Sequence, residues 1–197
     1  MRALVIYFLF ISIQCFAQQR PNVVYIMSDD HDDDAISAYS KKFIQTPNID
    51  RIAKEGARFD KAFVGNSICS PARATLLTGQ HSHKNGVPDN FHRFYSSKTT
   101  LPKLLQQSGY QTALIGKWHL HSYPTGFDYW RILPGMGQYV DTRMITMNGD
   151  TITEKGYSSD VITDDAINWL DQRYKTKPFV LFFHHKAPHR YFFPALK

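Results

Sequence analysis

The sequence has 197 residues, which is long enough for one α/β domain with a substantial hydrophobic core. Its net charge is +6 at pH 7, and the basic residues are spread along the chain rather than clustered among aromatic side chains. This pattern suits an anionic substrate and argues against a nucleic-acid-binding surface. Aromatic residues make up 14% of the chain, which also fits a carbohydrate-binding cleft.

Residues 1–17 have the pattern of a secretory signal peptide. Arg2 precedes an apolar run that is too short for a permanent membrane span, and Ala17 offers a small residue at the cleavage position. We expect cleavage after Ala17, which leaves residues 18–197 as one exported domain, either periplasmic or secreted.

Cleavage also leaves one cysteine of the two, Cys69. A single unpaired cysteine in an exported protein is either buried by accident or kept for chemistry, and we favour chemistry. Lipid attachment at Cys15 is an alternative, but Gln14 directly before it fits such a site poorly.

An apolar run at 22–28 predicts a strand buried on both faces of a parallel sheet, close to its centre. Asp29 and Asp30 follow at its carboxyl end, where open α/β sheets place ligands. Two adjacent carboxylates in a crevice need a cation, and oxygen ligands select calcium or magnesium. Residues 32–34 extend the acidic run, and we interpret them as a solvated loop.

Residues 46–56 combine a threonine N-cap, a first-turn proline, an apolar stripe and a glycine stop, so they predict a helix that covers the sheet. Looser alternation at 57–63 predicts a second strand.

The stretch 69–79 predicts a short helix. Pro71 suits a first turn, Gly79 supplies a left-handed stop, and Cys69 stands just before the helix start. Arg73 follows Cys69 by four residues, a spacing that brings the guanidinium toward the sulfur beside unpaired backbone amides. This position suits an anion.

His81 and His83 follow in a polar segment. They lack zinc partners at usual spacing, so we favour solvated loop histidines or substrate contacts. A short helix is expected from Thr100 to Gly109.

Residues 110–115 predict a further buried strand, with Lys117 and His119 after its carboxyl end. A hairpin is expected at 144–153, with its turn at Asn148-Gly149.

A helix should then open at Ser159, followed by a strand at 179–183. His189 lies after that strand and is positioned by the preceding proline, whereas His184 and His185 are interpreted as structural.

Two motifs resemble the signatures of the type I sulfatases. Cys69-x-Pro71-x-Arg73, followed by Leu77-Thr78-Gly79, matches the first, and the run from Gly109 to His119 matches the second. The resemblance covers nearly all of 21–197 and corresponds to the amino-terminal portion of the catalytic domain. It implies an alkaline-phosphatase-like α/β fold, with a largely parallel central sheet flanked by helices.

The resemblance also implies a metal, usually calcium, held by Asp29, Asp30 and position 69. Cys69 would be oxidised to formylglycine by a formylglycine-generating or sulfatase-maturing enzyme, and the hydrated aldehyde would be the nucleophile. Arg73 and Lys117 would then stabilise charge on the transferring group.

Two histidines would move protons in this reaction: His119 is the candidate base, and His189 would protonate the leaving alcohol. The expected reaction is hydrolysis of a sulfate ester on a sulfated glycan. Looser similarity at 86–90 and 185–190 points to N-acetylglucosamine-6-sulfatases and glycosaminoglycan degradation.

Two alternatives stay open. A phosphate or phosphonate monoester hydrolase would use the same nucleophile, since phosphate has similar geometry. Sulfatases also complete their metal shell with an Asp-Asn or Asp-His pair and add a further lysine much later in the chain. This sequence stops at Lys197 without them, so an inactive fragment or a glycan-binding remnant is the other alternative.

Overall fold

The computed structural model describes residues 20–195, so the expected signal peptide lies outside the described residues. Six strands form one mixed sheet in the order β1-β6-β2-β3-β4-β5, with β1, β6, β2 and β3 parallel and β4 and β5 antiparallel. The strands are β1 (Val23–Asp29), β2 (Gln111–Lys117), β3 (Tyr129–Leu133), β4 (Val140–Thr146), β5 (Thr151–Tyr157) and β6 (Phe179–Pro188).

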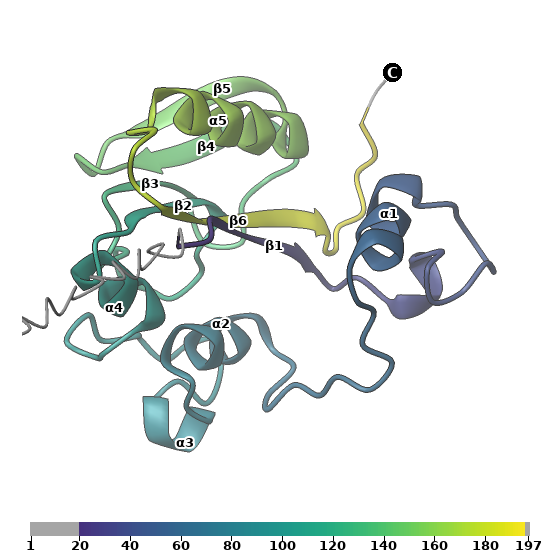
Figure 1. Cartoon of the computed structure of the whole chain (residues 1–197), viewed down its shortest axis with the longest axis horizontal. Coiled ribbons are helices and arrows are strands. Elements are labelled where there is room, and N and C mark those ends of the chain that lie inside the picture. The colour runs from purple at the N-terminus through teal and green to yellow at the C-terminus, as the bar shows by residue number, and fades with distance from the viewer. Residues whose placement is uncertain (1–19, 196–197) are drawn as a thin grey trace, which may run out of the picture.

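Helices pack on both faces of this sheet (Figure 1). The helical elements are η1 (Asp33–Ala35), α1 (Pro47–Glu55), α2 (Cys69–Thr78), α3 (Ser82–Asn85), α4 (Leu101–Gln107) and α5 (Ser158–Gln172). One core cluster joins α2 and the following loop to β2, β3 and β6, and it includes Leu77, Leu114 and Phe182. A second cluster packs α5, through Ile162 and Trp169, on the opposite face. The expected α/β fold with a largely parallel sheet is therefore confirmed.

The hairpin and the later elements also agree with the sequence. Gly149 adopts a φ of 86° at the β4–β5 turn, a conformation that suits glycine, and Thr146 donates its N–H to the carbonyl of Asp150. The helix predicted from Ser159 begins one residue earlier, at Ser158. Gly79, with a φ of 65°, ends α2 as predicted.

Three predictions were wrong: two about how an element packs and one about whether a strand forms. β1 is an edge strand, and the exposed fractions of Val24 and Ile26 are 47% and 56%. Helix α1 forms, but it lies away from the sheet, with Ile52 59% exposed (Figure 1). It is anchored instead to the preceding loop through hydrogen bonds of Ser37 and Thr46 to Asp50.

The third error is the strand expected at 57–63, where the chain is irregular and exposed. The alternation of apolar and polar residues at 57–63 was not matched by a neighbouring strand with which this segment could pair.

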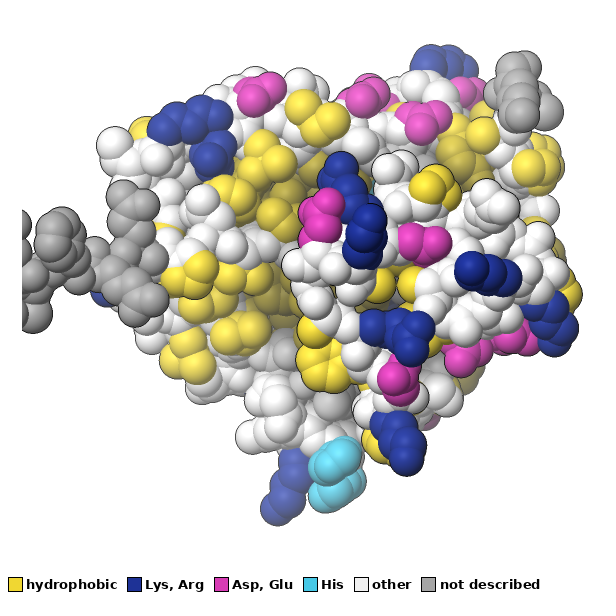
Figure 2. All heavy atoms as spheres, turned by 45° about the vertical axis from the view of Figure 1, so that its right-hand side comes forward, with side chains coloured by type: hydrophobic (Ala, Val, Ile, Leu, Met, Phe, Trp, Pro, Cys, Tyr) yellow, Lys and Arg dark blue, Asp and Glu magenta, His cyan; other side chains and the backbone are white. Residues whose placement is uncertain are grey.

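Figure 2 shows hydrophobic side chains gathered on part of the viewed face, with basic and acidic side chains interspersed. Within residues 20–195, no helix has both the length and the apolar character needed to cross a membrane.

Candidate active site

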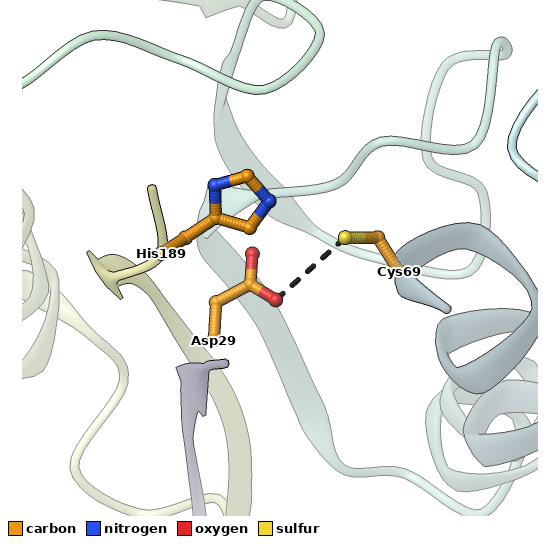
Figure 3. A group of neighbouring side chains, drawn as sticks. All are labelled: Asp29, Cys69 and His189. Atoms are coloured by element: carbon orange, nitrogen blue, oxygen red, sulfur yellow. Dashed lines mark hydrogen bonds between the residues drawn. The ribbon is translucent and has the colours of Figure 1, made fainter. Parts of the chain in front are cut away.

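Three strand ends and one helix start meet at the carboxyl edge of the sheet. Asp29 ends β1, Lys117 ends β2 and His189 follows β6, because these neighbouring parallel strands run in register toward the same edge. Cys69 begins α2 opposite them. In Figure 3 the side chains of Asp29, Cys69 and His189 point toward one another, and the Cys69 sulfur lies 3.8 Å from Oδ1 of Asp29.

The start of α2 holds the sulfur in place. The helix begins at Cys69 itself rather than after it, and Ile68 provides no side-chain cap. Asn90 fills this role, since its Oδ1 accepts the Ser70 N–H at 2.9 Å. The Ser70 hydroxyl donates to the carbonyl of His119 at 2.5 Å. Cys69 is a free, half-buried thiol, so it is accessible rather than walled into the core.

Two buried cations flank the sulfur. Lys117 is fully buried, donates to the Asp29 carboxylate and places Nζ 3.6 Å from Sγ of Cys69. The guanidinium of Arg73 lies 3.6 Å from the same carboxylate and donates to the carbonyl of Lys117 at 2.6 Å. Burial lowers the pKa of Arg73, while Asp29 opposes that shift. Two positive charges share one buried carboxylate, so the site carries a positive surplus that suits an anion.

Arg73 is oriented by His184, which the sequence indicated only as a structural residue. Nδ1 of His184 lies 3.1 Å from the guanidinium of Arg73 and 3.2 Å from the carbonyl oxygen of Lys117, and burial together with the charge of Arg73 keeps the pKa of His184 well below its usual value. His184 is therefore neutral: with its proton on Nε2 it accepts from Arg73, and with its proton on Nδ1 it donates to the carbonyl of Lys117. The glycine before Lys117, Gly116, is required here, because a Cβ on it would lie 1.9 Å from the carbonyl oxygen of His184.

The two proposed proton-transfer residues lie at this edge. Burial, Lys117 and Arg73 lower the pKa of His119 to about 4, so its ring is neutral near pH 7. His119 Nδ1 is buried and has no hydrogen-bond partner within the described part of the chain. His189 is 4% exposed, and its Nε2 lies 3.5 Å from Oδ2 of Asp30.

The donor groups fit part of a cation shell. Ligand atoms of Asp29, Cys69 and His189 lie within 4.8 Å of one another. The carboxylate of Asp30 is half-exposed and faces His189 rather than joining this group. Calcium takes about six to eight oxygen ligands, and in this group only the Asp29 carboxylate supplies oxygen atoms, with the Asp30 carboxylate next to it in the chain. The described residues therefore supply part of such a shell.

His81 and His83 do not reach the site. Both are exposed, and their rings stack with centroids 6.1 Å apart beside α3. His185 packs against the Phe183 ring, in line with its structural interpretation. The other residues that sequence reasoning missed are Ser70 and Asn90, whose contacts depend on how loops far apart in sequence meet.

Comparison with known proteins identifies the class that this fold and site define. The Sulfatase family profile matches residues 21–196, and the chain belongs to that family. It is 53% identical over 180 residues to an N-acetylglucosamine-6-O-sulfatase of Bacteroides thetaiotaomicron, covering 90% of this chain and 32% of that protein. It is 42% identical over 126 residues to arylsulfatase G of Rattus norvegicus, covering 58% of this chain and 24% of that protein.

Solved structures agree with the family assignment. A protein in complex with its substrate D-glucosamine-2-N,6-O-disulfate matches with a TM-score of 0.88 and 53% identity, covering 90% of this chain and 36% of that chain. Ps i-CgsB in complex with k-i-k-neocarrahexaose matches with a TM-score of 0.81 and 29% identity, covering 87% of this chain and 46% of that chain. The chain thus spans about a third of the first relative's length.

Proposed function

We propose that this protein hydrolyses a sulfate ester on a glycan, with 6-O-sulfated N-acetylglucosamine as the substrate class. The observation that carries the proposal is the pair of buried cations, Lys117 and Arg73, placed around the Cys69 sulfur at a helix start. The relatives support the substrate class, since one is named an N-acetylglucosamine-6-O-sulfatase and another was solved with a glucosamine disulfate.

The proposed nucleophile is made from Cys69. A separate maturing enzyme, which supplies the oxidant, would replace the thiol by an aldehyde, so that the side chain loses sulfur and two hydrogens and gains oxygen. Water then adds to the aldehyde and gives two hydroxyl groups on one carbon. The half-buried position of Cys69 at the start of α2 leaves room for this chemistry.

Charge and proton transfers fall to the surrounding side chains. One hydroxyl of the hydrate gives its proton to the neighbouring carboxylate of Asp29 and attacks sulfur, while the sulfur–oxygen bond to the sugar breaks and protonated His189 gives a proton to the departing oxygen. Lys117 and Arg73 offset the charge on the transferring group. The second hydroxyl then gives its proton to the ring of His119, which is neutral near pH 7, and the aldehyde re-forms as sulfate leaves.

A calcium ion is proposed at Asp29, Asp30 and the oxygen of the modified residue 69, where it would polarise a sulfate oxygen. We also propose export to the periplasm or the medium on the strength of the signal pattern in residues 1–17.

Turnover tests separate this reaction from its rivals. The matured protein should release sulfate from 6-sulfated N-acetylglucosamine but not from galactose or iduronate sulfates, and it should cleave an aryl sulfate faster than an aryl phosphate. Intact mass checks maturation independently, because conversion of Cys69 lowers the mass by about 18 Da. Faster phosphate turnover by a preparation with the mass change would overturn the sulfatase proposal.

A further inference from the structure

A second cationic pocket lies beside the site, and it centres on Lys186. This lysine is near the end of β6 and is only 4% exposed. It forms no ion pair with any carboxylate of residues 20–195. Its ammonium has a long hydrogen bond of 3.4 Å to the carbonyl of Arg190 and lies 4.7 Å from the centre of the Tyr139 ring. A buried charge without a counter-ion is costly unless a ligand supplies one.

Lys186 lines a cavity of about 300 Å³ that is mostly apolar. The other lining residues come from the segment before β4 and from the chain after β6: Gly137, Gln138, Tyr139, Val140, Tyr191 and Phe193. Aromatic rings beside one buried cation fit a sugar ring that carries a negatively charged substituent.

The pocket shares a wall with the active site. The Tyr139 hydroxyl donates to the carbonyl of His189, and the His189 N–H donates to the carbonyl of Lys186 at 3.0 Å. Burial lowers the pKa of Lys186, and the charge of Lys117 lowers it further, while Asp29 and Asp30 act in the opposite direction. Because these hydrogen bonds join Lys186 to His189, a group bound at Lys186 would lie next to the residue proposed to protonate the leaving oxygen.

We propose that Lys186 and this aromatic pocket form a second anion-binding subsite, which takes a further anionic substituent of the glycan. The proposal rests on the proposed function, because the substituent bound at Lys186 belongs to the same glycan whose sulfate ester is hydrolysed. Two sources share this chemistry: a sulfate on the same sugar and the carboxylate of a neighbouring uronic acid. Both present oxygen atoms to the ammonium.

A binding experiment tests the subsite apart from catalysis. Glucosamine 2-N-sulfate lacks the 6-sulfate and cannot be hydrolysed at that position, and N-acetylglucosamine is its uncharged counterpart. By calorimetric titration, the 2-N-sulfate should bind about tenfold more tightly than N-acetylglucosamine, because the ammonium supplies a charged hydrogen bond. A glucuronosyl-N-acetylglucosamine disaccharide should show the advantage instead if the carboxylate is the natural occupant.

Lys186→Met should reduce this advantage to within about twofold, whereas Lys186→Arg should retain most of it. The exposed Lys177→Met is the matched control and should bind like the wild type. Lys186→Met should also raise the thermal midpoint of the ligand-free protein, because it removes a buried charge that forms no ion pair with any of the described residues. Lys186→Gln provides the same comparison if the methionine variant fails to fold.

The outcomes separate the two proposals. If the wild type binds neither anionic probe more tightly than N-acetylglucosamine, or if the advantage survives in both Lys186→Met and Lys186→Gln, the subsite is overturned. If the charge-dependent binding is present but matured protein releases no 6-sulfate, the subsite stands and the proposed reaction is wrong.

Discussion

The ammonium group of Lys117 lies 3.6 Å from the sulfur of Cys69, and the same ammonium donates to the carboxylate of Asp29. One fully buried cation therefore connects the residue proposed as nucleophile with the residue proposed as metal ligand. Charge that develops at position 69 would be offset without rearrangement of the site.

Lys117→Met should lower kcat for sulfate release by about 10²- to 10³-fold, the cost typical of removing one preorganised charge donor. The exposed Lys177→Met should leave kcat unchanged. Steady-state kinetics on matured protein, with the mass change verified for each variant, makes this comparison. A Lys117→Met enzyme with normal kcat would contradict the role assigned to the ammonium.

Calcium should stabilise the folded protein through the Asp29–Asp30 pair. A ligand at about 100 times its Kd adds about 2.7 kcal/mol when it binds only the folded state. A thermal shift titration should therefore show a rise in Tm with calcium, reversed by a chelator. Asp30→Asn should weaken the response, and the exposed Asp171→Asn should keep it. An equal calcium response in Asp30→Asn would place the ion elsewhere.

Arg73→Ala should destabilise the fold as well as the site. Its side chain is 3% exposed, and the guanidinium donates to the Lys117 carbonyl, lies 3.1 Å from Nδ1 of His184 and faces Asp29, so removal leaves these buried polar groups unmatched. We expect a loss of about 3–5 kcal/mol in the free energy of unfolding. Urea denaturation measures it against the exposed Arg51→Ala, which should change by less than about 0.5 kcal/mol.

The pKa of His119 links stability to pH. Its folded-state pKa of about 4 lies below the ordinary value of 6.5, so between these values the unfolded chain binds a proton that the folded chain does not. The contribution of neutral His119 to the free energy of unfolding is therefore complete above pH 6.5 and falls as the pH drops toward 4. Denaturation at pH 7 and pH 5 should show a smaller decline for His119→Gln than for the wild type.

His184 and His185 have pKa values lowered in the same direction, so they leave a residual decline in the His119→Gln variant. The exposed His81→Gln should decline as the wild type does. An identical pH dependence in His119→Gln and His81→Gln would show that His119 is not held neutral.

Gly116→Ala should be severely destabilising. Its φ is 105°, and an added Cβ would lie 1.9 Å from the carbonyl oxygen of His184 on the neighbouring strand. The loss should reach about 4 kcal/mol or more, enough to prevent accumulation of folded protein. Gly135→Ala is the matched control: its φ is also positive, at 54°, but the added atom meets nothing within 4 Å. It should cost about 1 kcal/mol, measured by urea denaturation.

Local sequence determined which residues reach the site, because strand ends and a helix start can be identified from short patterns. The apolar run before Asp29 predicted its strand correctly, and Gly79 marked the end of α2. How many neighbours a strand or helix has is not a local property, so the position of β1 at the sheet edge and the exposure of α1 were missed.

The supporting contacts were equally hidden. His184 lies 111 residues from the guanidinium of Arg73, and Asn90 meets Ser70 through a loop that has no periodic pattern. Lys186 differs, since a lysine inside an otherwise apolar and aromatic strand was visible in the sequence. The signal could have been noticed, but only the structure shows that the ammonium forms no ion pair with a carboxylate of the described part of the chain.

β6 lies between β1 and β2, although it follows both of them in the chain. During synthesis, Asp29 and Lys117 therefore leave the ribosome long before β6, the strand that joins β1 to β2. Until residues 179–188 emerge, the edges of β1 and β2 that face β6 present unpaired backbone N–H and C=O groups, which are a template for pairing with other polypeptide chains.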